Sequence, residues 1–173
     1  MKIISIFGLV MFLLAGCQQP KLEKEEAASI VRTTLNFPKV YEYEIYTADP
    51  QVAGKLLDAG LETDGWLTVD RTQKLIDVGN PLIHFTEKTS PYLIRRDEKY
   101  KMQVVKVADM DLGEITGIRL TEDKKSAIVE YTVVYKNTTP FAKLIKYDFS
   151  KPKTQRINLS YFDTGWKLDK LHY

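Results

Sequence analysis

The stretch SAIVEYTVVYKN, residues 126–137, decides the fold because it carries an apolar or aromatic side chain at every second position. These side chains share one face of an extended strand: Ala127, Val129, Tyr131, Val133 and Tyr135. The opposite face includes Glu130, Thr132 and Lys136. A strand with one apolar and one polar face is typical of an antiparallel sheet that is covered on one side and solvated on the other.

Neighbouring segments extend this sheet with the same β-rich composition. The further predicted strands are KMQVVKV (101–107), EITGIRL (114–120), RINLSYF (156–162) and WKLDKL (166–171). Asp109-Met110-Asp111 and residues 121–125 predict solvated turns between these strands. Asp163-Thr164-Gly165 predicts a three-residue hairpin turn. Most of the second half of the chain is therefore expected to be sheet.

Helical patterns lie mainly in the first half. Residues 22–35 predict a helix, because acidic side chains open the segment and apolar residues recur at helical spacing. After a strand at 40–46, Asp49-Pro50 predicts the start of a helix over 50–59. Two Ser/Thr-Pro pairs predict short helical turns, namely Ser90-Pro91 and Thr139-Pro140. The expected fold class is α+β, with N-terminal helices followed by a mainly antiparallel β-sheet.

The segment at about 50–95 resembles a winged-helix module, with its helix followed by two strands and a polar loop at 70–80. Winged-helix modules bind DNA through a basic recognition helix. The helix here, PQVAGKLLDAG (50–60), carries one Lys and one Asp. The whole chain is also nearly neutral, with 25 Lys and Arg against 23 Asp and Glu. We therefore expect a scaffolding role for this segment and no nucleic-acid partner.

The N-terminus has the form of an export signal, because Lys2 is followed by an apolar run at 3–14. The run is shorter than the roughly 20 residues that a membrane-spanning helix needs. It ends in Leu14-Ala15-Gly16-Cys17, which resembles the lipobox of bacterial envelope lipoproteins, the class cleaved by signal peptidase II. Cys17 is also the only cysteine, so no intramolecular disulfide can form.

This resemblance implies cleavage between Gly16 and Cys17 after a signal peptide of residues 1–16. It further implies an S-diacylglycerol group and an N-palmitoyl group on Cys17, and two or three acyl chains on one residue make a lasting membrane anchor. Residues 17–21 would then form the lipidated tether and 22–173 a single α+β domain. Gln18 favours the periplasmic face of the outer membrane in a Gram-negative host. In a host with one membrane, the anchor implies that membrane's outer face.

Groups suited to catalysis are few. The chain has two histidines, His84 and His172, and no HExxH, GxSxG or P-loop motif. We therefore expect no catalytic residue, no metal and no cofactor, and the chain is predicted not to be an enzyme. A carboxylate-based hydrolase that uses Asp109, Asp111 and Glu114 is the minor alternative.

Other side chains offer binding surfaces. Tyr41, Tyr43 and Tyr46 are candidates for stacking, although alternation divides them between two faces. Arg95-Arg96 and Lys151-Pro152-Lys153 could contact anionic headgroups. The expected function is a non-enzymatic binding or structural role, with the membrane and an envelope protein as partners. The alternatives are an inhibitor or immunity-type protein against a toxin or lytic enzyme, and a carrier of a small apolar ligand.

Overall fold

The computed structural model describes residues 21–169, and sheet dominates that range. The helices are α1 (Lys24–Thr34) and α2 (Pro50–Asp58), with 3-10 turns η1 (Leu75–Asp77), η2 (Glu87–Tyr92) and η3 (Pro140–Leu144). The first strands are β1 (Lys39–Tyr46), β2 (Leu67–Val69), β3 (Ile83–Phe85) and β4 (Leu93–Asp97). The later strands are β5 (Met102–Leu120), β6 (Ser126–Lys136), β7 (Lys153–Phe162) and β8 (Gly165–Leu168). The chain is a mainly antiparallel α+β protein.

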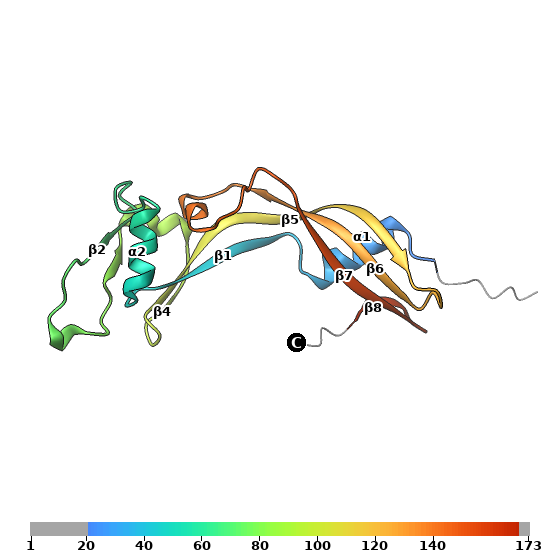
Figure 1. Ribbon diagram of the computed structural model, residues 1–173, viewed down its shortest axis with the longest axis horizontal. Coiled ribbons are helices and arrows are strands. Elements are labelled where there is room, and N and C mark those ends of the chain that lie inside the picture. Colours follow the sequence, from blue (N-terminus) through green and yellow to red (C-terminus); the bar gives the residue numbers. More distant parts are fainter. Residues whose placement is uncertain (1–20, 170–173) are drawn as a thin grey trace, which may run out of the picture.

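The main sheet has the strand order β1-β5-β6-β7-β8, and β4 pairs with β5 on the same side as β6. Every pairing is antiparallel, and β2 and β3 form a separate two-stranded sheet. Figure 1 shows the result as an elongated arch. One end holds α1, β7 and β8, while the other end holds α2 and β2, and β5 runs between the two ends.

Several local predictions are confirmed, while others are corrected. The helices over 22–35 and 50–59 are present as α1 and α2, and Thr139-Pro140 starts η3 as predicted. Ser90-Pro91 does not start a turn, because η2 begins at Glu87 and contains this pair near its end. However, β1 lies between α1 and α2, so the helices do not precede the whole sheet. The winged-helix resemblance is not confirmed, because α2 is the only α-helix within 50–95. At the last hairpin, Gly165 already pairs with Phe162, so the turn has two residues rather than three.

The predicted turn at Asp109-Met110-Asp111 is wrong, because these residues lie inside the single strand β5. The backbone of Asp109 pairs with Val40 on one side and with Lys136 on the other. Its carboxylate accepts a hydrogen bond from Asn137 Nδ2 at 2.8 Å and forms an ion pair with Lys106 Nζ at 2.6 Å. The carboxylate of Asp109 is therefore satisfied by Lys106 of the same strand and by Asn137, which follows β6, so Asp109 can lie within a strand.

β5 is irregular along its length. Its register with β1 shifts between Tyr41 and Glu42, and its register with β6 shifts twice between Leu112 and Gly117. Each of these shifts leaves one extra residue on β5. Such β-bulges bend a strand and increase its twist, which accounts for the curvature of β5 across the arch (Figure 1).

Two hydrophobic cores lie along the sheet, and β5 contributes to both. The α1-side core includes Val31, Leu112, Val129, Val133, Leu159 and Trp166. The α2-side core includes Ile45, Leu56, Leu61, Leu67, Val105 and Phe141. Full burial of one such aliphatic side chain contributes about 1.5–3 kcal/mol. Alternation puts Tyr131, Val133 and Tyr135 on the covered face of β6, as the sequence predicts, and Glu130 and Thr132 on the opposite face.

Replacement of Gly113 by alanine should destabilise the fold. A Cβ at this position would collide with Thr132 Oγ1, and it would also lie 3.2 Å from Val134 and 3.3 Å from the Thr132 carbonyl oxygen. Thr132 would have to move, although its hydroxyl accepts the Glu114 amide at 3.0 Å. We expect Gly113→Ala to lower the free energy of unfolding by about 1–3 kcal/mol, measured by urea denaturation.

Gly117→Ala is the matched control in the same strand. A Cβ there would find its nearest neighbour, the Cβ of Glu130, at 3.8 Å, which is ordinary van der Waals contact. Its loss of stability should be clearly smaller. Equal losses for the two variants would show that general strand effects, rather than the close approach of Thr132, explain the glycine.

Candidate functional site

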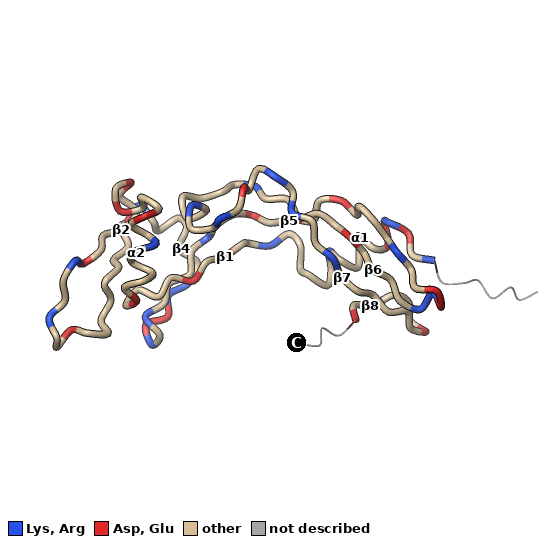
Figure 2. Tube along the Cα trace, viewed as in Figure 1, with Lys and Arg blue, Asp and Glu red and all other residues tan. Residues whose placement is uncertain are grey.

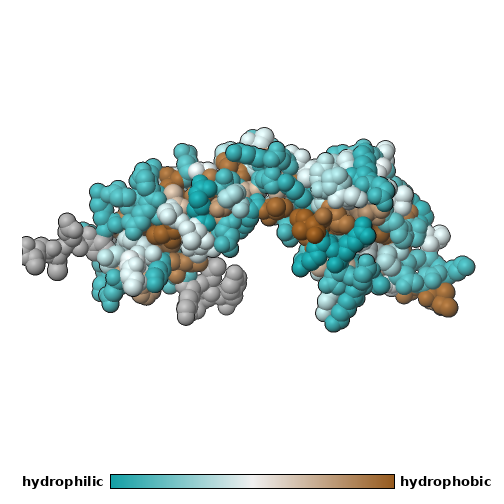
Figure 3. Space-filling view, turned by 180° about the vertical axis from the view of Figure 1, so that it is seen from behind, coloured by the Kyte–Doolittle hydropathy of each residue, from teal (hydrophilic) through white to brown (hydrophobic). Residues whose placement is uncertain are grey.

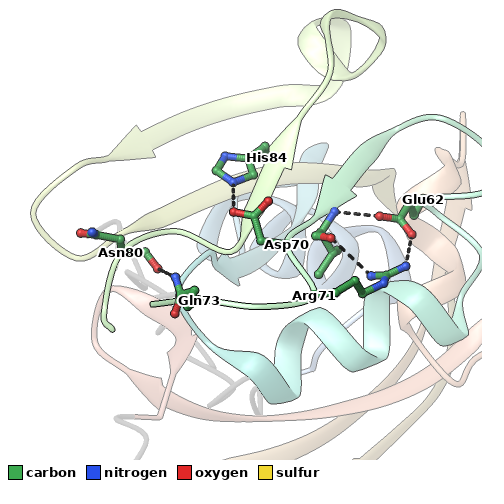
Figure 4. Close-up of polar contacts among 7 residues, drawn as sticks. Glu62, Asp70, Arg71, Gln73, Asn80 and His84 are labelled. Atoms are coloured by element: carbon green, nitrogen blue, oxygen red, sulfur yellow. Dashed lines mark hydrogen bonds and ion pairs between the residues drawn. The ribbon is translucent and has the colours of Figure 1, made fainter. Parts of the chain in front are cut away.

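The sequence-predicted catalytic candidates are dispersed. His84 lies on β3, where its Nε2 is 3.0 Å from Asp70 Oδ2, and both side chains are exposed (Figure 4). Within residues 21–169, no three His, Cys, Asp or Glu side chains gather in a way that could hold a metal ion. His172, Gly16 and Cys17 lie outside the described residues, so their roles stay predictions.

Two acidic side chains of β5 have separate partners, whereas Glu114 is exposed on the same strand and its backbone amide, not its carboxylate, is bonded to Thr132 Oγ1. Asp111 Oδ1 pairs with Arg32 of α1 at 2.8 Å, and Asp109 pairs with Lys106. The hydrogen bonds from Lys106 and Asn137 lower the pKa of Asp109 below its ordinary value. A carboxyl group that serves as a general acid needs a raised pKa. The lowered pKa therefore does not suit Asp109 to the general-acid role in the hydrolase alternative.

The loop between β2 and β3, residues 70–82, is here called the tip loop, and hydrogen bonds hold its base. Gln73 Nε2 donates to the Asn80 carbonyl oxygen at 3.1 Å, and the Asp70 amide donates to the Leu82 carbonyl oxygen at 2.9 Å. Together with the Asp70–His84 pair, these contacts close the loop across its width (Figure 4). The start of the tip loop is consequently bonded to its end, which constrains its base.

Glu62 adds a further brace beside the tip loop. One of its carboxylate oxygens accepts the Val69 amide at 2.8 Å, and the other forms an ion pair with Arg71 (Figure 4). The Val69 amide, and to a lesser degree the Arg71 guanidinium, lower the pKa of Glu62. The brace is therefore strongest when this carboxyl group is ionised.

The tip loop presents apolar side chains to solvent. Leu75, Ile76 and Val78 are 92%, 88% and 69% exposed. Figure 3 shows the corresponding hydrophobic surface at the extremity of the arch, at the lower right of that view. This apolar apex differs from the polar loop that the sequence predicts over 70–80. The available clue was three aliphatic residues within KLIDV (74–78), between turn-forming segments.

An aromatic cluster lies near the middle of the arch, where β1 and β6 approach the segment before β7. Its members are Tyr41, Tyr135, Tyr147 and Phe149, with ring centroids 5.0–6.0 Å apart in tilted or edge-to-face contacts. Burial, together with the neighbouring Tyr147 and Tyr41, raises the pKa of Tyr135. Of the three predicted stacking tyrosines, only Tyr41 belongs to this cluster. Tyr46 is exposed on the other face, and its hydroxyl donates to Glu44 at 3.2 Å.

A basic groove of about 560 Å³ adjoins the cluster between α2 and η3. It is lined by Tyr43, Lys55, Asp58, Ala59, Lys143, Leu144 and Lys146. Lys143 Nζ pairs with Asp64 at 2.7 Å, whereas Lys55 and Lys146 form no ion pair with any residue of the described range 21–169. Tyr43 and Tyr41 alternate onto one face of β1, and Lys146 precedes Tyr147, so the groove and the aromatic cluster take residues from the same two segments.

The other basic residues are less concentrated. Arg95 and Arg96 are exposed on β4, Lys151 pairs with Asp148 at 3.4 Å, and Lys153 Nζ lies 5.7 Å from the centre of the Tyr147 ring. Figure 2 shows residues of both charges distributed along the arch. Along the trace in that view, Lys and Arg positions are interspersed with Asp and Glu positions, whereas nucleic acids bind basic residues gathered on one face. The basic groove is therefore the main local concentration of positive charge that we find around a cavity.

Comparison with family models, with curated proteins and with solved structures found no match. Within residues 21–169, no helix combines the length and apolar character needed to cross a bilayer. The side chains of the tip loop, the aromatic cluster and the basic groove are therefore the basis for a functional proposal.

Glu62→Ala should loosen the tip loop, because it removes the acceptor of the Val69 amide and the ion-pair partner of Arg71. We expect several-fold faster hydrogen–deuterium exchange of the amides over 69–82, with little change in β6. Glu122→Ala, in the exposed turn between β5 and β6, is the control and should leave the tip loop unchanged. Unaltered exchange over 69–82 in the Glu62 variant would contradict the bracing role.

The same brace predicts a pH dependence. The pKa of Glu62 is lower in the folded chain than its ordinary value of 4.5, so ionised Glu62 favours the folded state. This contribution is complete above about pH 4.5 and is lost as the pH falls through the lowered pKa. Exchange over 69–82 should therefore accelerate on acidification in the wild type, after correction for intrinsic exchange, and this acceleration should be smaller in Glu62→Ala.

Proposed function

We propose that this chain is a membrane-anchored envelope lipoprotein with a non-enzymatic binding role. The anchor rests on Leu14-Ala15-Gly16-Cys17 at the end of the apolar run, with cleavage after Gly16 and lipid attached to Cys17. Gln18 supports the periplasmic face of the outer membrane if the host is Gram-negative. Residues 17–21 are the tether, and 22–173 is the exported domain.

The basic groove carries the binding role in this proposal. Lys55 and Lys146 line one cavity and form no ion pair with any residue of the range 21–169, and Lys143 adds a third lysine to a lining that holds one acidic residue, Asp58. Tyr43 and Leu144 supply apolar surface beside these charges. The volume lies within the roughly 300–1,000 Å³ of ordinary ligand sites. A groove of this kind complements an acidic segment of an envelope protein, because opposite charges steer and orient the partner.

An inhibitor or immunity-type role uses the same groove with a different protein partner, so it remains the second candidate. The carrier of a small apolar ligand has weaker support. Three ammonium groups line the groove, and an entirely apolar ligand would desolvate them without replacing their hydrogen bonds. The observation that favours an anionic partner is thus that Lys55 and Lys146 line the groove without an ion-pair partner among the described residues.

The anchor is tested by metabolic labelling with a palmitate analogue. We expect the wild-type chain to label and to fractionate with membranes, and Cys17→Ser to do neither, because Cys17 is the chain's only sulfhydryl group. Label retained on the Cys17→Ser protein would refute the assigned attachment site. An unlabelled wild-type protein would refute the lipoprotein assignment itself.

The binding role is tested by charge reversal in the groove. Lys55→Glu/Lys146→Glu should abolish retention of the envelope protein that co-purifies with the intact lipoprotein from detergent-solubilised envelopes. Retention by wild type should also weaken as salt rises, because the contact is electrostatic. Lys125→Glu/Lys167→Glu, at exposed positions in the β5–β6 turn and on β8, carries the same change in charge away from the groove and should bind normally. Equal binding by the groove variant would exclude the groove as the contact surface.

A further inference from the structure

The ends of the arch carry exposed apolar side chains at three turns. Besides the tip loop, with Leu75 and Ile76, Tyr100 in the β4–β5 turn is 60% exposed, and Phe162 at the β7–β8 turn is 52% exposed. In Figure 1 all three turns point to the lower side of the arch, the first two at one end and the third at the other. The segment 146–152 runs along the upper side. One side of the molecule thus presents apolar contacts at both ends.

We propose that the arch rests on the bilayer that holds the Cys17 lipid, with these three turns inserted into its interface. This inference depends on the lipid anchor of the proposed function. Lys21 lies only four residues beyond Cys17, a distance of at most about 14 Å for an extended chain. The described chain begins beside α1, at the end of the arch that carries the β7–β8 turn. The anchor therefore keeps that end close to the membrane surface.

Anchoring makes weak apolar contacts effective. Once the lipid is inserted, contact between the arch and the same bilayer is intramolecular in character and has a high effective concentration. Aliphatic side chains at the tip loop lose their exposure to water on insertion, which is favourable in proportion to the apolar surface buried. Tyr100 has the apolar body and polar hydroxyl that favour the membrane interface.

The charges beside these turns match an interface rather than a strongly anionic surface. Lys74 adjoins Leu75, and Lys99 and Lys101 flank Tyr100, with Lys99 Nζ 5.1 Å from the centre of the Tyr100 ring. Long lysine side chains can extend toward the headgroups while their stems stay with apolar surface. Acidic residues are equally close, namely Asp77, Glu98 and Asp163. The positive and negative charges nearly balance, so insertion should depend on apolar burial and should persist at high salt.

Bracing of the tip loop supports the same role. The Gln73–Asn80 and Asp70–His84 contacts constrain the base of a loop whose apex has almost no contact with the protein. A constrained loop loses less conformational entropy when its apex is buried in another phase. The loop is therefore suited to insertion without refolding.

The test labels cysteines that are introduced one at a time. Because Cys17 is blocked by lipid in the proposed lipoprotein, an introduced cysteine is the only free thiol. Ile76→Cys, Tyr100→Cys and Phe162→Cys are each labelled with a polarity-sensitive fluorophore in the full-length lipoprotein, reconstituted in phosphatidylcholine vesicles. Ser150→Cys, in the exposed segment on the upper side of the arch, is the matched control. All four positions are at least half exposed or in an exposed turn, so folding should be unaffected, as thermal melting will show.

We expect blue-shifted emission and quenching by nitroxide-bearing lipid at 76, 100 and 162, and neither effect at 150. Both effects should persist at high salt. Probes at 76, 100 and 162 that stay as solvated as the probe at 150 would overturn the inference, as would a blue shift that appears only after an envelope extract is added. Mass analysis of the same samples separates the two proposals. A lipidated protein with solvated probes removes the membrane contact alone, whereas an unlipidated wild-type protein removes the anchor and this inference together.

Discussion

The rest of the structure depends on one strand that serves two hydrophobic cores. β5 spans 19 residues, and it buries Val105 against the α2-side core and Leu112 and Ile115 against the α1-side core. A regular strand of that length would present its faces with an unbroken two-residue alternation. The extra residues opposite β1 and β6 shift that alternation and bend the strand. Both ends of the arch are therefore held by one hydrogen-bonded ladder.

This arrangement also positions the aromatic cluster, the basic groove and the tip loop. Tyr41 and Tyr43 stand on the same face of β1, one in the aromatic cluster and the other in the basic groove. The groove takes its lysines from α2 and from the η3 segment, which the sheet brings together. The tip loop lies outside the main sheet, on the two-stranded ribbon of β2 and β3. The basic groove between α2 and η3 and the apolar turns are thus separate surfaces with different chemistry.

Local sequence patterns predict much of this fold. The alternation over 126–137 defines β6, and Asp49 caps α2 as expected, with its carboxylate accepting the Gln51 amide at 2.7 Å. The same local reasoning fails at Asp109, because the polar side chains that satisfy it include Asn137, which is 28 residues away. Local patterns cannot predict the basic groove either, because Tyr43, Lys55 and Lys146 come from segments that are distant in the sequence. Exposure of Leu75 and Ile76 depends on where the rest of the chain packs, which no short window of sequence records.

The bulges of β5 also change the hydrogen-bonding border that this strand exposes. β1 pairs with β5 only as far as Met110, so over Asp111–Leu120 that border of the strand has no partner strand within the described residues. A long, flat border of unpaired amides and carbonyls is a template on which further copies can stack into fibrils. Two bulges fall within this stretch and interrupt its straight hydrogen-bonding row. The irregularity that curves the molecule thus also makes this border a poor seed for amyloid growth.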